Sequence, residues 1–327
     1  MNLSRKMFIL AVEEMNFTKA AHRSHVTQQC LSCHIKKLED HYHTRLFERR
    51  PKLRLTTAGK SLYQSLCQLE ILETSITEQI ADITEEKSGE ITFGINATRA
   101  RILMPGLITD YQKKFPMVKV SLVLDDMCKL VPMITNGNLD MFLGIDCISE
   151  QNLQMIHLAY DEAFLVARVN VLEKYTHSQQ ILNETLRTST IDLKNFRDMP
   201  MAGNNAGSSF SDLVNHYLDS QNIHRDIVFS VSDYELQIQI CSQNDVVSFC
   251  PKSVLGMVFK ENNNHSPEKE LKIFRLQNMD SRLRLDLVMH REMYLSRFKR
   301  EFIQLLQNNI LSNMQAVDAI LNLPYKG

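Results

Sequence analysis

Side chains able to contact nucleic acid gather between positions 27 and 54 of this 327-residue chain. One run carries hydroxyl, amide, thiol and ammonium groups, which can hydrogen-bond to base edges or to phosphates. It comprises Thr27, Gln28, Gln29, Ser32, Cys33 and Lys36. A second run places four cations around Pro51, and cations at this density bind phosphates. They are Arg49, Arg50, Lys52 and Arg54.

The first run has the pattern of a helix that is buried on one face. Leu31, Ile35 and Leu38 are spaced i, i+4 and i+7, which makes one apolar stripe. Gln29, Ser32, Cys33 and Lys36 then fall on the opposite face. Thr27 can cap this helix by accepting a hydrogen bond from an N–H of its first turn. We therefore expect a helix that starts at Gln28 and is polar enough on one side to enter a major groove.

The neighbouring segments complete a helix–turn–helix with a basic hairpin. A shorter helix is predicted to begin near Thr18, and its small Ala20 and Ala21 would let the second helix cross closely. A turn follows over residues 24–26. Pro51 interrupts an alternating apolar run, which predicts a small hairpin or "wing" whose cations meet phosphates or a minor groove.

The distribution of charge supports this interpretation. Residues 1–58 contain 11 Lys and Arg against 5 Asp and Glu, a net charge of +6, whereas the whole chain carries −1. A basic head on an acidic body is typical of a protein whose head binds nucleic acid.

The N-terminal segment resembles the winged helix–turn–helix of LysR-type transcriptional regulators. The matching residues are Phe17, Thr18, Ala20, Ala21, Val26, Thr27, Gln28, Leu31, Ser32, Ile35, Leu38, Glu39, Leu46, Phe47, Arg49, Leu55, Thr56, Ala58 and Gly59. The chain departs from the usual family residues at Ser24, Gln29, Cys30, Cys33 and His43. Cys33 stands where the family often has an arginine, so the family's base preferences do not transfer directly.

A long amphipathic helix is predicted next, over residues 58–87. Its apolar side chains repeat at spacings of three and four, without Gly or Pro between Gly59 and Gly89. These side chains are Leu62, Leu66, Leu69, Leu72, Ile76, Ile80 and Ile83. A helix of about 40 Å with a single apolar seam needs a partner helix. The resemblance implies that this linker helix forms a dimer.

Beyond Gly89 the pattern changes to alternating strands and helices, which indicates parallel sheet. The first unit runs through predicted strands at 89–95, 118–124 and 139–145, with helices at 101–115 and 127–136 between them. The second has strands at 200–203, 227–231 and 246–250, with helices at 209–219 and 234–242. A last strand at 283–290 and a helix at 296–309 would return to the first unit. The resemblance implies two lobes like those of periplasmic solute-binding proteins.

A ligand site is expected between these lobes, where loops lead from strand ends to helix N-termini. Thr98 and Arg99 follow the first strand and offer a hydroxyl and a guanidinium. Asn204 and Ser208 occupy the corresponding loop of the second lobe. We predict that these four residues bind a small polar effector, which we expect to be anionic.

The composition points away from several other classes. The chain is 44% hydrophobic and 23% charged, as in globular proteins, and it has no run of 18–20 apolar residues for a membrane span. Nucleophile-elbow, zinc-protease, P-loop and dinucleotide-binding motifs are missing, so we expect no enzyme, no cofactor and no metal site. The N-terminus lacks the features of a signal peptide, and we expect a cytoplasmic protein.

Two cysteines in the predicted groove-facing helix leave alternatives open. Cys30, Cys33 and His34 spell C-x-x-C-H, the haem-attachment string, but haem attachment would require an exported chain and a loop. A thiol switch at Cys30 and Cys33, or a metal site shared with His34, His41 and His43, is less remote.

The sequence thus predicts a LysR-type regulator that binds double-stranded promoter DNA under the control of a small effector. We expect a DNA-binding domain over residues 1–58, a linker helix over 59–88 and an effector-binding domain over 89–327. In the last, lobe I would span about 89–165 and 272–310, and lobe II about 166–271. We expect a homodimer through the linker helix and a homotetramer of two such dimers. The alternative is a cytosolic solute-binding sensory protein whose head engages a protein partner.

Overall fold

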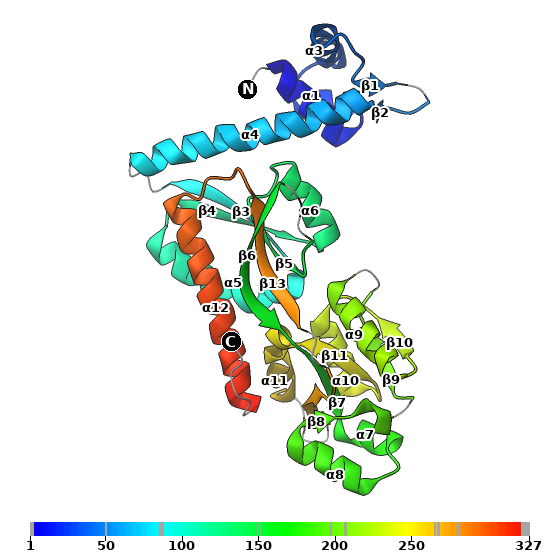
Figure 1. The fold of residues 1–327 in the computed structure, drawn as a ribbon. Coiled ribbons are helices and arrows are strands. Elements are labelled where there is room, and N and C mark those ends of the chain that lie inside the picture. Colours follow the sequence, from blue (N-terminus) through cyan, green and yellow to red (C-terminus); the bar gives the residue numbers. More distant parts are fainter. Residues whose placement is uncertain are drawn as a thin grey trace.

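The protein is a small helical head joined by one long helix to a two-lobed α/β body (Figure 1). The computed structural model describes residues 3–49, 51–84, 88–148, 150, 152–196, 198–205, 208–264, 266, 269–279 and 282–321. The fold class predicted from the sequence is confirmed.

Three short helices and a hairpin make the head: α1 (Leu3–Glu14), α2 (Phe17–Arg23), α3 (Gln28–His41), β1 (Phe47–Glu48) and β2 (Arg54–Leu55). The Asn16 side chain accepts from the N–H groups of Thr18 and Lys19, so α2 begins one residue before the predicted Thr18. Thr27 caps α3 as predicted, accepting from the Cys30 N–H at 3.1 Å. Leu31, Ile35 and Leu38 are buried, which confirms the predicted core stripe.

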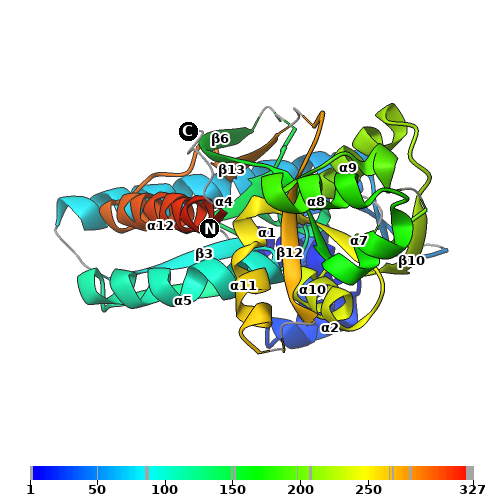
Figure 2. The same cartoon turned by 90° about the horizontal axis from the view of Figure 1, so that it is seen from below.

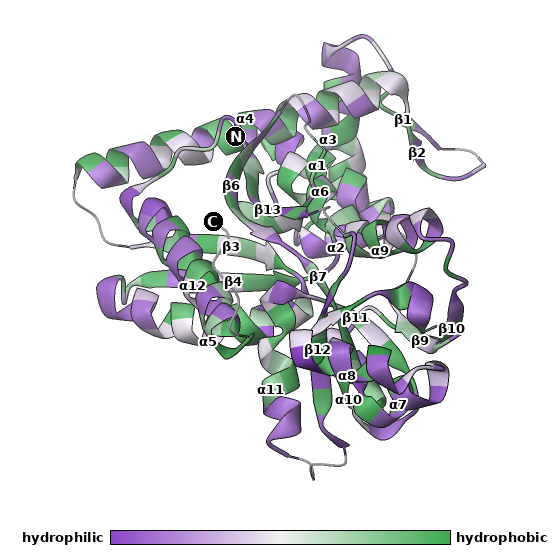
Figure 3. Ribbon diagram, turned by 60° about the horizontal axis from the view of Figure 1, so that its bottom comes forward, coloured by the Kyte–Doolittle hydropathy of each residue, from purple (hydrophilic) through white to green (hydrophobic). Residues whose placement is uncertain are grey.

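The linker helix α4 (Thr57–Ile83) joins the head to the body and has two different faces. One face lies against the first lobe: Lys299, whose side chain is 1% exposed, pairs at 2.7 Å with both Glu78 of α4 and Asp140. Burial raises the pKa of Glu78 even beside this ammonium group. The other face is apolar and open, with Leu72, Ile76, Ile80 and Ile83 exposed to solvent. Green and purple alternate along α4 accordingly (Figure 3).

The first lobe is a five-stranded mixed sheet with helices on its faces. The strand order is β4-β3-β5-β13-β6. Its strands are β3 (Gly89–Ile95), β4 (Val118–Leu124), β5 (Met141–Ile145), β6 (Leu153–Asp161) and β13 (Leu283–His290), and its helices are α5 (Ala97–Lys114) and α6 (Met127–Thr135). The β3–β4 and β3–β5 pairs are parallel, so the carboxyl ends of these strands meet at one edge of the sheet.

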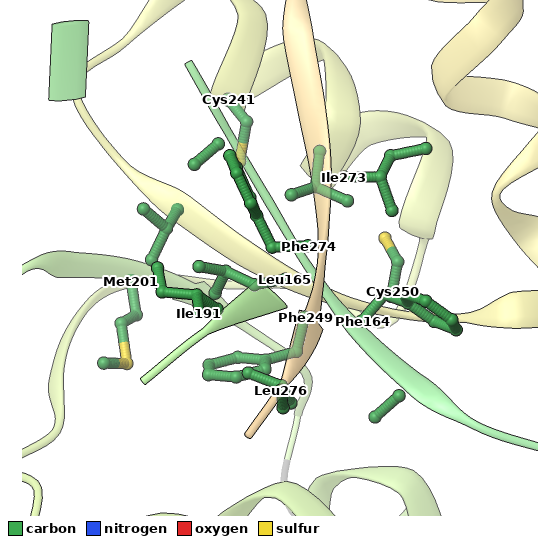
Figure 4. Packing of buried hydrophobic residues seen from close by; sticks show 14 of the residues in the cluster. Phe164, Leu165, Ile191, Met201, Cys241, Phe249, Cys250, Ile273, Phe274 and Leu276 are labelled. Carbon is green, nitrogen blue, oxygen red and sulfur yellow. The ribbon is translucent and has the colours of Figure 1, made fainter. Parts of the chain in front are cut away.

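The second lobe is a six-stranded sheet of order β10-β9-β11-β7-β12-β8. Its strands are β7 (Ala163–Arg168), β8 (Thr190–Ile191), β9 (Pro200–Gly203), β10 (Asp226–Ser230), β11 (Val247–Pro251) and β12 (Leu271–Leu276). Its helical segments are α7 (Val169–Tyr175), α8 (Gln179–Thr188), η1 (Leu193–Asn195), α9 (Ser209–Ser220), α10 (Tyr234–Gln243), η2 (Lys252–Val254) and α11 (Gly256–Asn262). Phe164, Phe249 and Phe274 of its central strands pack in one buried core (Figure 4).

Two details of the body refine the sequence prediction. Both sheets contain antiparallel as well as parallel pairs, because β13 and β7 run antiparallel to their neighbours as they cross between the lobes. The strand β12 pairs with β7 in the second sheet, so the return to lobe I falls after Leu276 and not at residue 272.

The last helix also differs from its prediction. Helix α12 (Arg297–Leu321) continues well past the predicted end at residue 309. It runs from the first lobe, beside α5, down to the second (Figures 1 and 2). Val317 joins the second lobe's core, and Asp318 pairs with the buried Lys252 at 2.7 Å. One helix therefore contacts α4 at its beginning and the second lobe at its end.

Candidate functional sites on the head and between the lobes

The polar face of α3 is open to solvent on the side opposite the head's core. Gln28, Gln29, Cys33 and Lys36 are exposed, and Ser32 is partly buried. Thr27 is also exposed, although its hydroxyl is occupied as the helix cap. The predicted base-reading side chains thus share one accessible helix face.

The predicted phosphate-binding cations lie on the hairpin. Arg49, Lys52 and Arg54 are exposed, and Arg49 has its guanidinium 5.5 Å from the centre of the Phe17 ring. Arg50 lies outside the described residues. Arg23 differs from these cations, because it is held in ion pairs with Glu13 at 2.7 Å and Glu14 at 3.1 Å.

Two contacts fix the hairpin relative to α3 and α4. The Glu39 carboxylate, at the end of α3, accepts from the N–H groups of Leu46 at 2.9 Å and Phe47 at 3.4 Å. Gly59, in the first turn of α4, lies so close to the hairpin that an added Cβ would come within 2.1 Å of the Leu46 carbonyl oxygen. These contacts give physical reasons for two residues of the sequence motif.

The two head cysteines are exposed, as free thiols, on α3. The His34 side chain instead lies against α1, with its Nδ1 2.9 Å from the Ser4 hydroxyl. Within the described ranges, no three His, Cys, Asp or Glu side chains lie close enough to hold a metal ion.

A cavity of about 210 Å³ lies between the two lobes. The first lobe lines it with Asn96, Arg99, Asp125, Asp126, Met127, Cys128, Leu130, Leu143 and Ile145. The second lobe contributes Asn204, Asn205, Ser208, Ser209, Phe210, Ser232 and Tyr234. Three of the four predicted effector residues, Arg99, Asn204 and Ser208, are therefore brought together. Thr98 is only 1% exposed and is not part of the lining.

The Arg99 guanidinium is not a freely available charge. It is 4% exposed and lies 3.3 Å from the carboxylate of Asp161, at the end of the crossing strand β6. Asp161 also accepts from the N–H of Ser253 at 3.0 Å and from its hydroxyl at 2.6 Å. This chain of contacts ties α5 of the first lobe to η2 of the second.

The second lobe's wall is a hydrogen-bonded network. The Asn204 side-chain amide donates to the Tyr234 hydroxyl at 2.8 Å, and the Gln237 side-chain amide in turn donates to Asn204 Oδ1. The Ser248 hydroxyl donates to Gln237 Oε1 at 2.7 Å. Burial raises the pKa of Tyr234, so its phenol stays protonated. The Asn204 side chain is thereby held in one orientation. The Ser208 hydroxyl caps α9 by accepting from the Ser211 N–H at 3.0 Å.

Two carboxylates of the cavity wall, Asp125 and Asp126, were not among the predicted effector-binding residues. Asp125 and Asp126 follow β4, the parallel neighbour of β3, so they reach the same sheet edge as Arg99. The position of both loops at one sheet edge could have predicted these two residues as part of the cavity. A hydrogen bond from Lys129 lowers the pKa of Asp125.

Three further polar contacts cross the cleft directly. Arg101 of α5 pairs with Asp233 at 2.8 Å and with Glu235 at 3.3 Å, both at the start of α10. The hydrogen bond to Asp233 raises the pKa of Arg101. The Ser209 hydroxyl donates to the Ile145 carbonyl at 3.2 Å. These polar contacts hold the lobes together at the mouth of the cavity.

Comparison with known proteins gives the family. Residues 5–60 match the model of the bacterial regulatory helix–turn–helix protein, lysR family, and residues 84–310 match that of the LysR substrate binding domain. The chain is 25% identical over 310 residues to the HTH-type transcriptional regulator CysL of Bacillus subtilis, covering 94% of this chain and 97% of that protein. It is 25% identical over 250 residues to the regulator AlsR of the same organism, covering 75% of this chain and 78% of that protein.

Solved structures share the fold. A full-length OxyR variant from Pseudomonas aeruginosa matches with a TM-score of 0.66 and 19% identity, covering 95% of this chain and 94% of that one. Full-length CbnR in complex with its target DNA matches with a TM-score of 0.56 and 17% identity, covering 94% and 98%. No described helix is both long and apolar enough to cross a membrane. The two family models together account for head and body, and the chain belongs to the LysR family of transcriptional regulators, which bind promoter DNA and small effectors.

Proposed function

We propose that residues 1–58 bind promoter DNA in the cytoplasm, with α3 in a major groove and the hairpin against the backbone. Gln28, Gln29 and Ser32 would contact base edges. Lys36, Arg49 and Lys52 would contact phosphates, and Arg50 belongs to the same basic run. We assign Thr27 to the helix cap and, because it is exposed, to a contact with DNA at the first turn of α3. Cys33 lies on the side of α3 that would face the groove.

The observation that carries this proposal is the exposed polar face of α3 next to exposed cations that have no acidic partner among the described residues. Among the described residues, Arg23 is the head cation with ion pairs to acidic side chains, and it lies away from the hairpin on α2. A cation without an internal partner does not have to break an ion pair within the protein before it binds a phosphate.

We propose that α4 pairs with α4 of a second copy. Its open apolar side chains include Ile76, which is 57% exposed, and Ile83, which is 75% exposed. They recur on one face at helical spacing, and burying them against an identical helix removes apolar surface from water. Family members form oligomers, and two such dimers would form a tetramer through contacts between their α/β bodies.

We propose that a small polar effector binds between the lobes and contacts Arg99, Asn204 and Ser208. Thr98 supports the wall from behind rather than contacting the ligand, because its side chain is buried. A ligand that contacts both lobes favours one lobe arrangement over others. Helix α12 then offers a mechanical route from the cleft to the DNA, because it contacts the second lobe and, through Lys299, the linker helix.

DNase footprinting on the intergenic region upstream of the chain's own gene tests the proposal. We expect protection of several tens of base pairs, spread over successive helical turns and weakened at higher salt. An unrelated DNA fragment of equal length is the control. Equal protection of both fragments would rule out sequence-specific binding by α3. Absence of protection at any salt would favour the sensory protein that acts through a protein partner.

A further inference from the structure

The cavity wall near α6 carries one negative charge in excess. Asp125 and Asp126 both line it, while Lys129, paired with Asp125 at 2.9 Å, is the single cation of this group. Asp126 is exposed and is not paired with a lysine or arginine anywhere in the described chain. A ligand that presents only negative charge would meet repulsion here.

The position of the Asp126 side chain is unusual for its place in the fold. Asp126 is the N-cap residue of α6, yet its carboxylate makes no capping hydrogen bond to the helix. It accepts instead from the Asn96 amide at 3.3 Å, and Asn96 also lines the cavity. An aspartate at this position ordinarily accepts from an N–H of the first turn. The carboxylate therefore remains available on the cavity side.

The remainder of the cavity offers hydrogen-bond donors suited to an anionic group. Arg99, 4% exposed, lines it, and its Nε has no partner among the residues that the structure describes. A buried guanidinium nitrogen without a partner is costly, and a ligand oxygen would satisfy it. The Ser208 hydroxyl and the Asn204 amide approach from the other lobe. Cationic and anionic recognition groups thus share one small space.

We propose that the effector is a small zwitterion, a free α-amino acid, with its ammonium group at Asp126 and its carboxylate toward Arg99 and Ser208. This inference rests on the proposed function of the cleft and refines the effector from anionic to zwitterionic. The two groups of the ligand would engage the N-cap residue of α6 in the first lobe and that of α9 in the second. A zwitterion therefore suits both the charge and the two-lobed construction of the site.

Isothermal titration calorimetry of the full-length protein with each of the twenty common amino acids tests the inference. For the tightest binder, two matched analogues follow: the acid with hydrogen in place of its ammonium group, and the amine with hydrogen in place of its carboxylate. We expect each analogue to bind at least about tenfold more weakly, because each leaves one charged partner unsatisfied.

Asp126→Asn is the decisive variant, and Asp110→Asn is its matched control, since Asp110 is an exposed α5 residue outside the cavity lining. We expect Asp126→Asn to bind the amino acid about tenfold more weakly and to bind the deaminated acid with unchanged affinity. Asp110→Asn is expected to bind like the wild type. The difference between the two ligands separates a lost ammonium contact from general damage to the site.

Any of three outcomes would overturn the proposal of a zwitterionic effector. The deaminated acid could bind as tightly as its amino acid, Asp126→Asn could bind the amino acid with unchanged affinity, or all twenty amino acids could fail to bind. If the protein still protects the upstream DNA, these results would contradict this inference alone, and a simple anion would again be the expected effector. If the protein does not protect the upstream DNA, the proposed function itself would be contradicted.

Discussion

The head and the cleft use charge in opposite ways. On the head, Lys36 and Lys52 are exposed and have no ion-pair partner within the described part of the chain. In the cleft, Arg99 is bound to Asp161, and Asp125 to Lys129. The head is also one contiguous stretch of sequence, whereas the cleft is assembled from segments more than a hundred residues apart, such as those of Arg99 and Ser208.

This difference indicates what each region is suited to bind. Unpaired surface cations attract any polyanion and make its affinity strongly dependent on salt. Among the described residues, the cleft holds most of its charges in internal pairs and leaves the Asp126 carboxylate unpaired, so it responds to a ligand that matches this arrangement of groups, which favours selectivity over raw affinity. The two regions can therefore be separated by experiment. Variants on the head, in the cleft and where α4 joins the head to the first lobe should differ in whether they change stability or ligand affinity.

The largest effect is expected at the junction between the two regions. Lys299→Met leaves the carboxylates of Glu78 and Asp140 close together without their cation. Breaking a buried ion pair in this way costs about 3–5 kcal/mol. Urea unfolding of the full-length protein, monitored by circular dichroism, should show this loss in the free energy of unfolding.

Lys272→Met is the matched control for Lys299→Met. Lys272 pairs with Glu270 at 2.8 Å, but both side chains are 44% exposed. The control should change the free energy of unfolding by less than about 1 kcal/mol. Similar effects of the two substitutions would mean that α4 is not fixed to the first lobe by its buried charges.

An intermediate effect is expected on the head. Gly59→Ala places a Cβ against the Leu46 carbonyl oxygen and the Leu55 side chain. Overpacking of this kind costs about 1–3 kcal/mol, so thermal unfolding of the head should begin at a lower temperature while ligand binding in the cleft is preserved. Gly106→Ala, at an exposed helical position, should be neutral or slightly stabilising. Weaker ligand binding by Gly59→Ala would show that the two regions are not independent.

The smallest effect is expected at the mouth of the cleft. Arg101→Ala removes the ion pairs to Asp233 and Glu235, and the arginine side chain is 52% exposed. Exposed pairs contribute less than about 1 kcal/mol, so the ligand's dissociation constant should change by no more than about fivefold. Calorimetry measures that change. A change of a hundredfold would mean that the arrangement of the two lobes depends mainly on the ion pairs of Arg101.

The head could be predicted from the sequence because its determinants are local. The Thr27 cap and the stripe of Leu31, Ile35 and Leu38 depend on spacings within a few turns, and the structure has both. The start of α2 was predicted near Thr18 and lies at Phe17, where the Asn16 cap fixes it locally.

The cleft was predictable only in part because its contacts span the chain. Strand ends correctly pointed to Arg99, Asn204 and Ser208 as neighbours. The burial of Thr98 and the use of Arg99 by Asp161, 62 residues away, depend on how strands cross between the lobes. The contact of α12 with the second lobe has the same origin, since Asp318 meets Lys252 only in the folded chain.

The most direct test of the contrast between head and cleft is the salt dependence of DNA affinity. The slope of log affinity against log salt would be measured for the wild type, for Asp126→Asn and for a triple variant with Lys36, Arg49 and Lys52 each changed to Ala. We predict a slope less steep by about 2–3 in the triple variant, since each lost phosphate contact contributes about 0.9, and no change in Asp126→Asn. An unchanged slope in the triple variant would contradict DNA binding by the head.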